Sequence, residues 1–76
     1  QRHKAEIIFV KYKHFKQALL FKVGSINDIG WNLAIAHLKD GDRGKAIETL
    51  ELLISHSESD IVVEKCKKLI SDIKQL

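Results

Sequence analysis

The sequence predicts an all-α protein built as an antiparallel four-helix array. Alternation of apolar and polar residues with a period of two is absent at useful length, whereas apolar residues recur at three- and four-residue steps through four segments. Because the 76 residues include no proline, only glycine and polar clusters punctuate the chain, at 23–25, 39–42 and 55–59. Turns this short make consecutive helices antiparallel neighbours.

The first helix is expected over residues 4–22, and it is apolar on more than one side. One set of apolar residues recurs at helical spacing: Ala5, Ile8, Tyr12, Phe15 and Leu19. A second set, with lysines between its members, comprises Ile7, Val10, Ala18 and Phe21. A helix that is apolar on two sides packs on two sides, so this segment needs more than one neighbour.

The second helix is expected over residues 25–39. Ser25 with Asp28 resembles a capping box in which Asp replaces Glu, and Gly41 stands where a left-handed C-cap favours glycine. This helix also has two apolar faces, formed by Ile26, Ile29, Leu33 and Ala36, and by Trp31, Ile35 and Leu38.

The third and fourth helices are expected over residues 43–55 and 60–75, each with one buried side. Asp42 is the predicted N-cap of the former, and Ser59 or Asp60 that of the latter. The buried stripe of the third helix comprises Ala46, Ile47, Leu50, Leu53 and Ile54. That of the fourth comprises Val62, Cys66, Leu69, Ile70, Ile73 and Leu76, which makes Cys66 a core thiol.

Positive charge is concentrated at the start of the chain. The net charge is +3 overall, but residues 1–22 carry +5 and the remainder −2. The basic patch of the first helix comprises Lys4, Lys11, Lys13, Lys16 and Lys22. Such a patch favours an acidic partner or nucleic acid, or else it is a solvated lysine face. No helix-turn-helix pattern supports DNA reading, because the second helix bears almost no base-reading polar residues.

Several classes of protein are disfavoured by the composition. One cysteine makes no internal disulfide, which predicts a reducing, intracellular (cytoplasmic or nuclear) location. No apolar run of about 18 residues predicts a membrane span. The histidines and Cys66 lack metal-ligand spacing, so neither a metal nor a cofactor is expected. No oriented nucleophile is found, so the chain is not expected to be an enzyme. A chain that starts at Gln1 and has no Met is expected to be a fragment of a longer protein.

Residues 31–50, WNLAIAHLKDGDRGKAIETL, resemble a tetratricopeptide repeat, a family of helical hairpins of about 34 residues. The similarity rests on Leu33-Ala34, the Gly41-Asp42 turn, Ala46-Ile47-Glu48 and Leu50, and it is best over residues 26–55. The sequence departs from the family pattern at three places. Gly30 stands where the family has its aromatic residue, His37 replaces the usual tyrosine, and Glu58 stands where proline is common.

The resemblance implies a single helical domain over residues 1–76. Residues 25–56 would form the repeat hairpin, residues 1–23 the second helix of a preceding degenerate repeat, and residues 59–76 a C-terminal capping helix. In this family the first helix lines a peptide-binding groove. The matching positions here are Asp28, Trp31, Asn32, Ile35, Leu38 and Lys39. Asn32 would hold the backbone of the ligand through its amide. Alternatively, the apolar members of this set are core residues packed on the first or fourth helix.

The expected function is therefore that of a non-enzymatic scaffold that binds a peptide or helix of another protein. One alternative is self-association through the spare faces of the first two helices. A less favoured alternative is a nucleic-acid-binding domain that uses the basic first helix.

Overall fold

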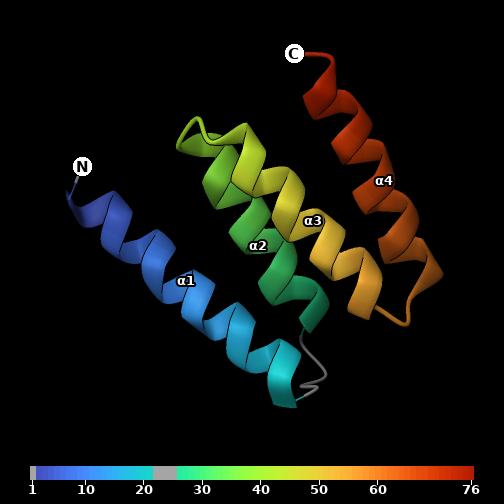
Figure 1. Cartoon of the computed structure of the whole chain (residues 1–76), viewed down its shortest axis with the longest axis horizontal. Coiled ribbons are helices and arrows are strands. Elements are labelled where there is room, and N and C mark those ends of the chain that lie inside the picture. Colours follow the sequence, from blue (N-terminus) through green and yellow to red (C-terminus); the bar gives the residue numbers. More distant parts are fainter. Residues whose placement is uncertain (1, 22–25) are drawn as a thin grey trace.

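The computed structural model describes residues 2–21 and 26–76, with the side chains of residues 6–20 and 26–76. This part of the chain forms four helices and no strand, which confirms the all-α class (Figure 1). The helices are α1 (Arg2–Phe21), α2 (Ile26–Lys39), α3 (Arg43–His56) and α4 (Asp60–Lys74). Their bounds lie within two residues of the predicted ones. The colour gradient in Figure 1 shows that successive helices run in opposite directions.

The turn between α2 and α3 is built by two residues. Gly41 has a positive φ of 82°, the left-handed conformation predicted for it. Its N–H donates to the Leu38 carbonyl at 3.0 Å, and the N–H of Asp42 donates to the His37 carbonyl at 2.9 Å. This pair of hydrogen bonds is a Schellman motif. The Oδ1 of Asp42 then accepts from the N–H of Lys45 at 3.0 Å, so Asp42 is the N-cap of α3 as predicted.

The N-cap of α4 is Ser59, which decides between the two predicted candidates. Its Oγ accepts a hydrogen bond from the N–H of Val62 at 3.3 Å. The capping box predicted at Ser25 lies outside the described residues.

The core follows the order of the helices along the chain. Helix α2 packs against both α1 and α3, and α4 packs against α3. The buried cluster comprises Phe15, Leu33, Ala34, Ala46, Leu50, Leu53, Cys66 and Ile73. These residues confirm the centres of the predicted stripes on α3 and α4. The edge of the last stripe was predicted wrongly, because Leu76 follows the end of α4 and is 72% exposed.

The molecule is a thin slab of 35 × 32 × 13 Å. A slab leaves its broad faces open to solvent, and α1 shows the result. The members of its predicted second apolar set differ in burial, because Ala18 is buried whereas Ile7 and Val10 are exposed. No other helix among the described residues covers this side of α1, so large apolar side chains remain exposed there.

Gly30 lies at a close approach of α2 to α1 and α3. It is buried in α2, and a Cβ atom at this position would lie 2.7 Å from Cε1 of Phe15 and 3.1 Å from a methyl of Leu53. Phe15 of α1 therefore occupies the space that an aromatic residue at position 30 would need. This contact gives a physical reason for glycine at position 30.

Candidate functional site: a groove between α1 and α3

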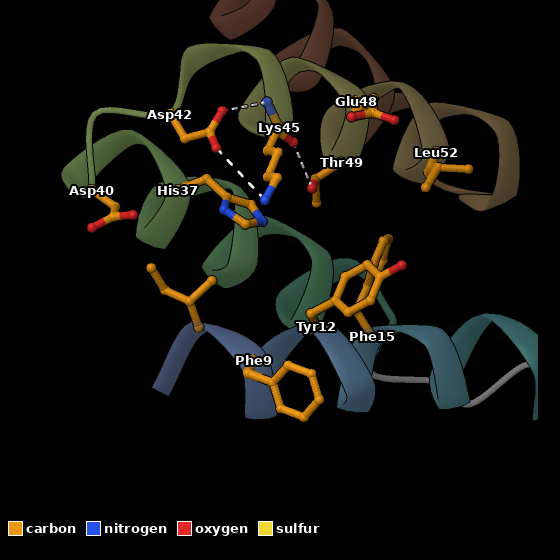
Figure 2. Close-up of a pocket in the computed structure, with 11 residues that line it drawn as sticks. Phe9, Tyr12, Phe15, His37, Asp40, Asp42, Lys45, Glu48, Thr49 and Leu52 are labelled. Carbon is orange, nitrogen blue, oxygen red and sulfur yellow. Dashed lines mark hydrogen bonds and ion pairs between the residues drawn. The ribbon is translucent and has the colours of Figure 1, made fainter. Parts of the chain in front are cut away.

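A groove with a volume of about 530 Å³ runs between α1 and α3 (Figure 2). Helix α1 forms one wall, α3 forms the other, and the end of α2 forms part of the floor. The lining residues from α1 are Ile8, Phe9, Tyr12 and Phe15. Those from the other elements are His37, Asp40, Asp42, Lys45, Glu48, Thr49 and Leu52. A volume of this size suits a few inserted side chains.

The floor contains two buried polar residues, His37 of α2 and Thr49 of α3. The hydroxyl of Thr49 donates to the Lys45 carbonyl at 2.8 Å, so this group is satisfied within its own helix. Burial lowers the pKa of His37 because it removes water from the imidazolium, and Lys45 lowers it further, while Asp42 opposes the change. The imidazole on the groove floor is therefore neutral at neutral pH.

This lowered pKa predicts a pH-dependent stability. In the unfolded chain, His37 takes up a proton near its ordinary value of about 6.5. The folded protein binds that proton only at lower pH, so the free energy of unfolding falls as the pH drops through about 6.5 and levels off below the folded pKa. Urea unfolding at about pH 7.5 and about pH 5.5 measures the loss.

The matched variants for this test are His37→Leu and His14→Gln. His37→Leu is expected to reduce the difference in stability between the two pH values. His14→Gln is the control, because it removes a histidine that is exposed on α1 and does not line the groove. An equal pH dependence in the His37→Leu variant and the original chain would contradict the prediction.

On the α1 wall, two lysine ammonium groups lie over the faces of two aromatic rings. The Nζ of Lys13 lies 5.4 Å from the centroid of the Phe9 ring, and the Nζ of Lys16 lies 5.1 Å from that of Tyr12. At these distances the cations interact with the faces of the rings. The wall thus combines apolar area with positive charge.

The opposite rim of the groove is acidic. Asp40, Asp42 and Glu48 stand there with Lys45 as the one cation among the lining residues. Lys45 is engaged by Asp42, since the Nζ lies 3.9 Å from Oδ2 (Figure 2). Asp40 and Glu48 therefore give this rim a negative charge facing the basic wall.

The predicted partner-binding residues lie along another side of α2. Trp31, Ile35 and Leu38 are half-buried, and Trp31 and Leu38 pack against the core. Asp28, Asn32 and Lys39 are exposed. The Nζ of Lys65, from α4, lies 4.9 Å from the centroid of the Trp31 ring. At 100° per residue, Asp28 lies about 180° around the helix from His37, whereas Leu38 and Trp31 lie only about 100° and 120° from it, so the set is centred on another side of α2 than the groove.

The predicted basic patch is brought together only in part. Lys13 and Lys16 are exposed on the α1 wall, whereas Lys11 is half-buried on another side of the helix. The side chain of Lys4 and the whole of Lys22 lie outside the described part of the structure.

Sequence reasoning missed the groove and the burial of His37. The groove needs two helices that are not neighbours in sequence, and periodicity describes one helix at a time. One signal in the sequence could have indicated the α1 wall of the groove. Ile8, Tyr12 and Phe15 share one side of the helix, and Phe9 lies at the edge of that side.

The described residues offer little other chemistry. Burial raises the pKa of the Cys66 thiol, although Lys65 opposes the change, so the thiolate is disfavoured. Among the described residues, no three His, Cys, Asp or Glu side chains gather as a metal site would require. No described helix has both the length and the apolar character needed to cross a membrane.

No protein-family model matches the chain, and neither does any curated protein or solved structure. The described residues form an all-α fold with a groove that is lined by apolar side chains and flanked by charged ones.

Proposed function

We propose that the chain is a non-enzymatic interaction module of the tetratricopeptide type, which binds a peptide or a helix of another protein through α2. The observation that carries the proposal is the mixed side of α2, where half-buried Trp31, Ile35 and Leu38 adjoin exposed Asp28, Asn32 and Lys39. Accessible apolar area beside fixed polar groups is what a peptide-binding surface requires.

The arrangement of the helices supports the repeat interpretation. Residues 25–56 would be the repeat hairpin, closed by the Schellman turn at Gly41, with Ala34 and Ala46 buried where the helices meet. In this proposal α1 is the second helix of a preceding degenerate repeat, and α4 is the capping helix. Helix α2 would then have the place of the groove-lining first helix.

Each side chain has a distinct proposed role. Trp31 supplies apolar area, and tryptophan is over-represented among residues that dominate binding energy. Lys65 lies over one face of its ring, which helps to hold that ring in place. The Asn32 amide can donate to and accept from the backbone of an extended peptide. Lys39 and Asp28 adjust the charge at the two ends of the surface.

The experiment is a selection from a random peptide library displayed on phage, with the 76-residue chain as bait. Selected peptides are then titrated against the chain. Because Trp31 is the only tryptophan, its fluorescence reports binding on this side of α2. Asn32→Ala is expected to weaken binding about tenfold or more, and so is Trp31→Ala, whose affinity is measured by calorimetry because this variant has no tryptophan.

The control is Leu20→Ala, which removes an exposed apolar side chain from α1. This variant is expected to bind the selected peptides as the original chain does. Circular dichroism of each variant checks that the helices remain. The proposal is wrong if no peptide is selected, or if the affinities of the folded Asn32→Ala and Trp31→Ala variants are unchanged.

A further inference from the structure

We infer that the face carrying the groove between α1 and α3 is an interface for a second copy of this chain. The inference concerns another side of α2 than the one on which the proposed peptide-binding residues are centred. It therefore stands or falls independently of that proposal. Three features of this face favour a second copy as its partner: its exposed apolar area, its distribution of charge and its size.

Apolar side chains are exposed around the groove. Phe9 is 60% exposed, Tyr12 41% and Leu52 43%, and they stand on the two walls of one groove. Apolar side chains gathered in this way mark an interaction site, whereas single exposed ones need no explanation. A partner that covers the groove would bury two aromatic rings and a leucine on each side.

The two walls of the groove carry opposite charge. Lys13 and Lys16 do not line the groove themselves, but their ammonium groups lie over the Phe9 and Tyr12 rings of its α1 wall. Glu6 is the only acidic residue of that helix. On α3, Glu48 lines the groove, and Glu51 is exposed three residues further along the same helix. Lys45, the one cation among the lining residues, is paired with Asp42.

Because its two walls carry opposite charge, this face is complementary to the same face of a second copy. Figure 1 shows that α1 and α3 run in the same direction. A two-fold axis along the groove would place the α1 wall of each copy over the α3 wall of the other. In that arrangement the lysines of one copy meet Glu48 and Glu51 of its partner, and the contact is made twice, as in any isologous dimer. The aromatic rings of each α1 would lie beside Leu52 of the other copy.

The face that carries the groove is also large enough for an interface of standard size. The groove opens opposite α2, on a broad face that measures 35 by 32 Å. A face of this extent can supply the roughly 800 Å² per partner that a standard interface buries. The slab has too little interior to hide these side chains by itself, whereas a second copy covers them.

The primary experiment is sedimentation equilibrium of the 76-residue chain from about 1 µM to about 1 mM, the range in which modest interfaces assemble. A monomer–dimer equilibrium is expected. It is also expected to weaken at high salt, because paired exposed charges are screened. A chain that remains monomeric throughout this range overturns the inference.

Charge reversal identifies the face. The double variant Lys13→Glu/Lys16→Glu makes both walls acidic, and Glu48→Lys/Glu51→Lys makes both walls basic. Each variant alone is expected to dimerise at least about tenfold more weakly, because like charges then oppose each other. An equimolar mixture is expected to recover dimerisation, since each reversed wall then meets its complement twice. All four positions are exposed, so the fold should persist, and circular dichroism checks it.

The mixing result separates this interface from other modes of association. A dimer that neither double variant weakens uses another face and overturns the inference. Weakened variants that do not recover on mixing contradict the proposed pairing of walls. Recovery on mixing supports the pairing of the walls, because damage to the fold of one variant would not give a 1:1 heterodimer.

Discussion

Replacement of Gly30 by valine is expected to lower the free energy of unfolding by about 3 kcal/mol, at the upper end of the usual cost of overpacking. The first added carbon would lie 2.7 Å from the Phe15 ring and 3.1 Å from Leu53. Both neighbours are fully buried and have little freedom to move. Chemical denaturation followed by circular dichroism measures the change.

The other described glycines provide matched controls for this prediction. Gly41→Ala is expected to cost about 1 kcal/mol, because alanine is strained at a φ of 82°, although the added carbon meets nothing. Gly44→Ala, in the first turn of α3, is expected to raise stability by up to about 0.5 kcal/mol, because its nearest neighbour would be 3.8 Å away.

A second variant tests the cause of the Gly30 effect. Phe15→Leu removes the ring atoms that Cβ would meet, so Gly30→Ala is expected to cost less in the Phe15→Leu background than in the original chain. The close-approach explanation is incorrect if Gly30→Ala stabilises the original chain as much as Gly44→Ala does.

Leu53→Ala is expected to lower the free energy of unfolding by about 3–4 kcal/mol. A domain of this length has a total stability of about 4–11 kcal/mol, so this loss is a large share of it. Leu53 is fully buried in α3 and faces Gly30, at the meeting point of α1, α2 and α3. Truncation would leave a cavity in a slab that has few other residues to fill it.

The neighbouring residue is the control. Leu52→Ala removes the same atoms one position earlier, but Leu52 is 43% exposed on the groove wall. Its cost is expected to stay below about 1 kcal/mol, since far less area is lost from a buried environment. Comparable losses for the two variants in denaturant titrations would show that the burial pattern of α3 is misassigned.

Much of the fold could be predicted because its signals are local. Gly41 and Asp42 define the central turn through their own backbone and side-chain preferences, and both predictions are confirmed. The buried centres of α3 and α4 followed from periodicity, since each helix has one apolar side. The exposure of Leu76 depended on where α4 ends, and the choice between Ser59 and Asp60 as its N-cap depended on where α4 begins. Periodicity leaves both ends of a helix open.

The candidate site was harder to predict because it belongs to pairs of helices. The groove exists because α1 and α3 both pack on α2, a relation that no single segment encodes. No feature of the sequence indicated that His37 is buried. The need for glycine at position 30 could not be predicted either, because it depends on the contact with Phe15 of another helix. The proposed peptide-binding side of α2 remains a prediction, because half-burial of Trp31 suits both a ligand surface and the edge of a core.

The dual role of Asp42 has a consequence for the order of folding. One residue closes α2 through its N–H and starts α3 through its carboxylate, so the two helices share a nucleus of short sequence separation. Strong packing joins only helices that are consecutive along the chain, and such low contact order gives fast folding. We expect the α2–α3 hairpin to form first and to protect its amides from hydrogen exchange longest, with α1 and α4 opening independently at the two ends.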